Sequence, residues 1–118
     1  MIKARNERMS RITVKMGEFY IEYSTIQDAP VEYGLKLEDY RKWYAEEYGR
    51  SGSSNFCIDV MRADRGGELL ARDVIRNNCS GDKGGKLTYD KFYRAYCLRE
   101  IVDGWTPASN EVRWRAQS

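Results

Sequence analysis

Residues 11–23 alternate between apolar and polar side chains on either side of Gly17, and this pattern constrains the fold more than any other feature of the chain. Alternation with a period of two is typical of a β-strand that buries one face. A tight loop centred on Met16 and Gly17 therefore predicts an antiparallel hairpin with one apolar and one polar face. The predicted register pairs Val14 with Phe19, Ile12 with Ile21, Lys15 with Glu18, Thr13 with Tyr20 and Arg11 with Glu22.

Helical periodicity predicts a helix over Leu37–Tyr48, with Gly49 as its C-terminal cap. The apolar face of this helix consists of Leu37, Tyr40, Tyr44 and Tyr48. Residues 27–34 contain an aspartate and a proline and are typical of a connecting loop. Residues 50–55 are rich in serine, so we expect a flexible connector there.

A short imperfect repeat marks the second half of the chain. The sequence Asp-Arg-Gly-Gly-Glu-Leu at 64–69 recurs at 82–87 as Asp-Lys-Gly-Gly-Lys-Leu, and apolar residues at helical spacing follow each copy. The repeat therefore predicts two tight turns, which enter helices at 68–77 and at 89–103. The second helix would have Thr88 as its N-cap and would end at Gly104.

Together these elements predict an α+β fold, in which an N-terminal antiparallel β-hairpin, which another strand could extend, packs against three or four helices. Residues 56–62 alternate like a strand but also fit a helix. The length of 118 residues is that of a single domain. The predicted division is a flexible or helical basic arm at 1–10, a single α+β domain at 11–104 and a C-terminal tail at 105–118.

Several residue types on which enzymes and metal sites depend are missing or badly spaced. The chain has no histidine, the commonest general base and metal ligand. Its three cysteines form no Cys-x-x-Cys pair, so we expect free thiols in a reducing compartment, no bound metal and no other cofactor. The repeat does not match a calcium loop, because Arg62 and Lys91 would occupy ligand positions. We therefore expect a protein that is not an enzyme.

The sequence also lacks a signal-peptide pattern and any run of about 18 apolar residues that could cross a membrane. We expect the protein in the cytoplasm, or in the cytoplasm of a host cell, without membrane contact. Its 20 Lys and Arg against 18 Asp and Glu give a net charge of +2, which is not the charge of a protein that coats nucleic acid.

Surface recognition is the remaining function class, and aromatic side chains are its first candidates. Nine Tyr and three Trp belong to the residue types that anchor protein interfaces. As partner-binding residues we select Tyr20 on the polar hairpin face, Trp43 on a helix flank and Trp114 between two arginines. The preferred hypothesis is a non-enzymatic intracellular protein-binding module: an inhibitor, adaptor or assembly factor. One such class is the phage or mobile-element protein that blocks a bacterial defence complex, as anti-CRISPR proteins do.

The helix expected at 89–103 has a second apolar stripe opposite its main face, formed by Ala95, Leu98 and Val102. A surface helix needs only one apolar face. Either the chain itself buries both sides of this helix, or Leu98 and Val102 form a homodimer or partner interface.

The alternative function is that of an accessory nucleic-acid-binding protein, which would use the basic segment at 62–99. The basic residues proposed for that surface are Arg62, Arg65, Arg72, Arg76, Lys83, Lys86, Arg94 and Arg99. Aspartates lie between them and would repel phosphates, so the sequence favours a protein partner over a nucleic acid.

Overall fold

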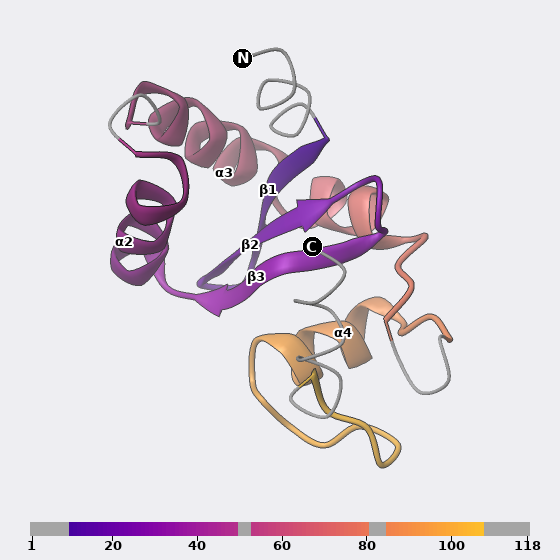
Figure 1. Cartoon of the computed structure of the whole chain (residues 1–118). Helices are drawn as coiled ribbons and strands as arrows, with labels where there is room; N and C mark the ends of the chain where they lie inside the picture. The colour runs from indigo at the N-terminus through magenta and orange to yellow at the C-terminus, as the bar shows by residue number, and fades with distance from the viewer. Residues whose placement is uncertain (1–9, 50–52, 81–84, 108–118) are drawn as a thin grey trace.

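The computed structural model describes residues 10–49, 53–80 and 85–107 (Figure 1). The elements are, in order, β1 (Arg11–Met16), β2 (Phe19–Ser24), β3 (Ala29–Leu35), α2 (Leu37–Tyr48), α3 (Ser53–Ile75) and α4 (Tyr89–Tyr96). The strands form one antiparallel sheet in the order β1-β2-β3. The predicted α+β class is confirmed, with a three-stranded sheet in place of a hairpin and three helices in the described residues. No helix in these ranges is long and apolar enough to cross a membrane.

The predicted hairpin exists, but its register differs from the prediction by two residues. Met16 pairs with Phe19, so the turn is Gly17-Glu18 and is not centred on Met16-Gly17. Gly17 has a φ of +62° and Glu18 has no positive φ, which is the pattern of a type II′ turn. The other observed pairs are Val14 with Ile21, Ile12 with Tyr23, Lys15 with Tyr20, Thr13 with Glu22 and Arg11 with Ser24. A shift by two leaves every side chain on its predicted face, because strand side chains repeat every two residues.

The segment that we expected to be a loop at 27–34 contains most of β3, so that prediction was wrong. Pro30 and Gly34 made the strand hard to recognise from the sequence, because both residue types are depleted in sheets. β3 lies at the edge of the sheet, where a strand tolerates a proline that cannot donate a backbone hydrogen bond. Burial of Tyr33 holds the strand in place: its ring packs edge-on against Tyr96, with the two ring centroids 4.7 Å apart.

α2 has the predicted bounds, and Gly49 ends it with a φ of +68° and a backbone N–H that donates to the carbonyl of Ala45. α3 differs more from the prediction. It already includes residues 53–55, which we expected in a connector, and residues 56–62, which fitted either a strand or a helix. The Gly-Gly pair of the first repeat copy is a bend inside this element, since Gly67 has non-helical dihedrals (φ 55°, ψ −142°). The helix after the bend ends at Ile75, two residues before the predicted end.

Both faces of the sheet are covered, and the bent α3 contributes to both covers. On one face, β1 and β2 side chains pack with the second half of α3 and with α4; this core includes Val14, Ile21, Tyr23, Ala71, Ile75, Phe92 and Tyr96. On the other face, Tyr20 packs with α2 and the first half of α3; this core includes Tyr40, Tyr44, Phe56 and Ala63. Figure 1 shows α3 passing beside β1, the strand that it contacts most.

α4 begins as predicted, since the side chain of Thr88 accepts a hydrogen bond from the N–H of Lys91 at 3.3 Å. However, α4 ends at Tyr96, so the prediction that this helix continues to residue 103 was wrong. Asp103 and Gly104 both have positive φ, and Val102 and Trp105 exchange two backbone hydrogen bonds of 2.9 Å. This is the pattern of a type I′ turn, for which Asp-Gly is a favoured sequence. The turn places Val102 and Trp105 in the core beside α4.

The end of α4 meets β3 at Gly34. A Cβ atom at this position would lie 2.4 Å from the carbonyl oxygen of Tyr96, and the φ of Gly34 is +68°. Gly49 has the same φ, but a Cβ there would meet nothing within 4 Å.

The two glycines therefore provide a matched pair of alanine substitutions. We expect Gly49→Ala to lower the free energy of unfolding by about 1–3 kcal/mol through backbone strain alone. Gly34→Ala adds a steric clash and should lower it by roughly 1–3 kcal/mol more. Urea denaturation of the two variants measures the difference. Equal losses would contradict the close packing of α4 on β3.

Candidate functional site

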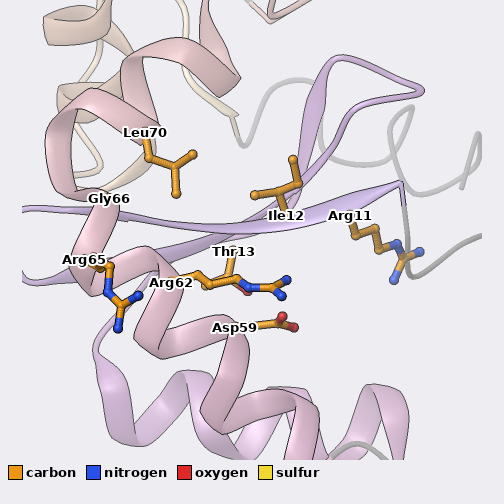
Figure 2. A pocket seen from close by; sticks show the side chains of 8 residues that line it. All are labelled: Arg11, Ile12, Thr13, Asp59, Arg62, Arg65, Gly66 and Leu70. Atoms are coloured by element: carbon orange, nitrogen blue, oxygen red, sulfur yellow. The ribbon is translucent and has the colours of Figure 1, made fainter.

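A groove of about 470 Å³ lies between β1 and α3, at the bend of the helix (Figure 2). Its volume is within the range of protein ligand pockets. Its lining residues all come from these two elements: Arg11, Ile12 and Thr13 from β1, and Asp59, Arg62, Arg65, Gly66 and Leu70 from α3. Successive strand residues point to opposite faces of a sheet, so Ile12 and Thr13 place the groove across the outer edge of β1.

The Gly-Gly pair gives the groove its shape. The bend at Gly67 turns α3 around the edge of the sheet, as described above. A Cβ atom on Gly66 would lie 2.5 Å from the Cβ of Leu70, so this position needs a glycine for Leu70 to come as close as it does. Figure 2 shows Leu70 and Ile12 on one side of β1, with Thr13, Arg62 and Asp59 on the other.

The hairpin register directs part of the β1 backbone toward this edge. In a hairpin with a two-residue loop, the closing pair Met16–Phe19 is hydrogen-bonded, and bonded pairs then alternate along the strands. The N–H of Thr25 donates to the carbonyl of Ser10 at 2.7 Å, which continues the same alternation beyond β1. The backbone N–H and C=O groups of Arg11 and Thr13 therefore point away from β2, toward the side on which the groove lies.

Guanidinium groups dominate the charge of the groove. Arg11 donates to the carboxylate of Glu47 at 2.7 Å and to the hydroxyl of Tyr48 at 3.3 Å. Burial lowers the pKa of Arg11, but these hydrogen bonds outweigh burial and raise it overall, so Arg11 stays charged. Arg62 and Arg65 are exposed, and neither forms an ion pair with any described residue. The lining therefore carries two exposed arginines that have no ion pair among the described residues, beside a single carboxylate, Asp59.

The acidic groups near the groove already have partners. The hydroxyl of Tyr44 donates to the Asp59 carboxylate at 2.7 Å. Asp64 accepts a hydrogen bond from the Tyr20 hydroxyl at 2.7 Å and lies 3.5 Å from the ammonium of Lys15.

A buried carboxylate lies on the same sheet face as Thr13. Glu22 is 2% exposed, and its Oε1 accepts hydrogen bonds from Thr13 at 3.1 Å and from Tyr40 at 3.0 Å. The hydroxyl of Tyr48 donates to its other oxygen. Burial raises the pKa of Glu22, while these three hydrogen bonds oppose the rise without cancelling it. The cluster joins β1 and β2 to α2, and Glu22 itself is closed to solvent.

The predicted partner-binding residues differ in how far they are exposed to solvent. Tyr20 is 4% exposed because α2 and α3 cover the face that we expected to be open. Burial and the hydrogen bond to Asp64 raise the pKa of Tyr20 to about 12. Trp43 is half-buried against the α2 tyrosines. Val102 is buried in the core and Leu98 lies exposed beyond the end of α4, so they do not form a helical stripe. Trp114 lies outside the described residues.

Only two residues of the predicted basic surface line the groove, namely Arg62 and Arg65. Arg72, Arg76 and Arg94 pair with Glu68, Asp73 and Glu100 at 2.6, 3.6 and 2.8 Å. The guanidinium of Arg99 lies over the Tyr33 ring, 5.1 Å from its centroid. Lys86 is exposed away from the groove lining, and Lys83 lies outside the described residues. Sequence reasoning missed Arg11 and Asp59 at this site, because nothing local signals that β1 and α3 meet.

Comparisons with protein-family models, with curated proteins and with solved structures gave no match. Within the described ranges, no three Cys, Asp or Glu side chains lie close enough together to hold a metal ion. The three cysteines are free thiols.

The buried carboxylate predicts a pH effect on stability. The raised pKa of Glu22 means that the folded protein binds this proton more tightly than the unfolded chain, whose carboxyl has the ordinary value of 4.5. The free energy of unfolding should therefore fall as the pH rises from 4.5 through the folded-state pKa. Glu22→Gln keeps the shape of the side chain and removes the ionisation. The free energy of unfolding of the variant should therefore lack this fall, and its stability relative to the wild type should increase as the pH rises.

Chemical denaturation at a series of pH values measures this effect. Glu38→Gln, which changes an exposed carboxylate on α2, controls for the loss of one negative charge. Parallel curves for the wild type and Glu22→Gln would show that the buried carboxyl does not control the pH dependence.

Proposed function

We propose that this chain is a protein-binding module that docks a partner protein on α3 and in the groove beside it. The observation that supports this proposal is that one face of α3 carries both exposed apolar side chains and two arginines that have no acidic partner among the described residues. Ile58 and Met61 are 45% and 58% exposed, and with Arg62 and Arg65 they share one face of α3 at helical spacing. Methionine and arginine are enriched in protein interfaces, where apolar contact and charge recognition combine.

A nucleic-acid partner has less support from the same surface. Phosphate binding draws on a continuous set of free positive charges. Three arginines of the predicted basic segment, Arg72, Arg76 and Arg94, are instead paired with acidic side chains. Exposed Ile58 and Met61 beside the remaining arginines fit a protein surface better than a phosphate backbone.

We propose that the module acts by binding and not by catalysis. The buried carboxylate of Glu22 resembles a catalytic group in its raised pKa, but its 2% exposure leaves no access for a substrate. Binding on a helix and groove suits an inhibitor, adaptor or assembly factor that covers a surface of a larger complex. The anti-CRISPR-like role suggested by the size of the chain is one proposal within this class.

The test uses the tagged full chain and two matched double variants. Arg62→Ala with Arg65→Ala removes the groove charges, whereas Arg76→Ala with Lys86→Ala removes the same two charges elsewhere on the surface. Proteins captured from the native host are identified by mass spectrometry, and the binding of the purified partner is then titrated. Arginines at interface hot spots cost about 2 kcal/mol or more on truncation. We therefore expect the groove variant to bind at least roughly 30-fold more weakly, and the control variant to bind like the wild type.

Two results would contradict the proposal. One is a partner whose affinity falls equally in both double variants. The other is tight, steeply salt-dependent binding to mixed DNA or RNA, which would favour the nucleic-acid alternative.

A further inference from the structure

We infer that the groove between β1 and α3 binds a short extended segment of the partner in which acidic and apolar residues alternate. The inference rests on the proposed function and specifies the chemistry that the partner presents. It follows from the charge, the backbone direction and the two unlike walls of the groove.

The charge argument concerns Arg62 and Arg65. Arg11 is satisfied by Glu47 and Tyr48, and the lining holds one carboxylate, Asp59, against three arginines. The two exposed guanidinium groups have no acidic partner among the described residues. A guanidinium presents its N–H donors in a planar fork that matches a carboxylate bidentately. An Asp or Glu side chain is therefore the ligand that complements these two groups.

The backbone argument concerns the outer edge of β1. The register directs the N–H and C=O groups of Arg11 and Thr13 away from β2, toward the groove side of the strand. Because Thr13 is 4% exposed, an extended peptide reaches this edge at its Arg11 end, and the side chains of the peptide then alternate between the two faces of the sheet. The volume of about 470 Å³ limits the bound segment to a few residues.

The two walls of the groove have different chemistry, and they lie on opposite sides of β1. Ile12 and Leu70 form an apolar wall on one side, and on the other side Arg62 supplies the charge beside Thr13, which is 4% exposed and whose hydroxyl donates to Glu22 (Figure 2). Successive side chains of an extended segment would point to these walls in turn. The preferred ligand thus carries an aliphatic residue next to each acidic residue, and a uniformly acidic peptide meets only one of the two walls.

The probe is a fluorescein-labelled peptide of five residues, Glu-Leu-Glu-Leu-Glu, measured by fluorescence anisotropy with the full-length protein. A peptide of the same composition, Glu-Glu-Glu-Leu-Leu, breaks the alternation, and Lys-Leu-Lys-Leu-Lys reverses the charge. We expect the alternating acidic peptide to bind at least tenfold more tightly than either control peptide. Arg62→Ala with Arg65→Ala should reduce its binding at least tenfold, and Arg76→Ala with Lys86→Ala should leave it unchanged. Backbone amide NMR shifts should change at Arg11 and Thr13.

Equal binding of the two acidic peptides would overturn the alternation, and binding that ignores Arg62 and Arg65 would overturn the site. Tighter binding of polyphosphate, competing with the peptide for the same arginines, would replace the carboxylate ligand by a phosphate polymer. A partner that depends on Arg62 and Arg65 but does not compete with the alternating peptide would refute this inference and leave the proposed function intact. A peptide that binds as expected while no partner depends on these arginines would refute only the proposed function.

Discussion

The bend of α3 at Gly67 is the constraint on which the rest of this structure depends. A three-stranded sheet has two faces to cover, and the helix reaches both because it turns around the outer edge of β1. The halves of α3 place Ala71 in one core and Ala63 in the other, and both residues are fully buried. Small side chains at these positions let the helix backbone approach the sheet closely. The groove exists because a bent helix cannot follow a strand edge in contact along its whole length.

The hairpin and α2 could be predicted from the sequence because their signals are local. Alternation assigned each strand side chain to its face, and the spacing of the α2 tyrosines with Gly49 gave both ends of that helix. β3 could not be recognised, because Pro30 and Gly34 oppose a strand locally and only the edge position and the burial of Tyr33 favour one. The end of α4 was missed because helical spacing of apolar residues continues to Val102. Val102 is buried because the Asp-Gly turn pairs it with Trp105, and not because it lies on a helix.

The candidate site was visible in the sequence only in part. Arg62 and Arg65 stood out as basic residues, but so did Arg72 and Arg94, which the structure shows paired with acids. A net count of charge cannot separate the two kinds of arginine, since the difference lies in which side chains the fold brings within reach. Tyr20 shows the opposite case, a polar aromatic residue that looks exposed on its own strand and becomes interior once α2 and α3 cover that face.

The covering of both sheet faces also has a consequence for the growing chain on the ribosome. The strands end at Leu35, whereas the side chains that cover them come from α2, α3, α4 and Trp105. Nascent residues 11–35 therefore leave the ribosome before the helices that cover them. At that stage the three strands have exposed apolar side chains and unpaired edges. Such a small sheet is marginal in water by itself, and open edges favour pairing with other chains. Protection from aggregation therefore begins when α3, which reaches both faces, emerges, and it is complete only after α4 and Trp105 have followed.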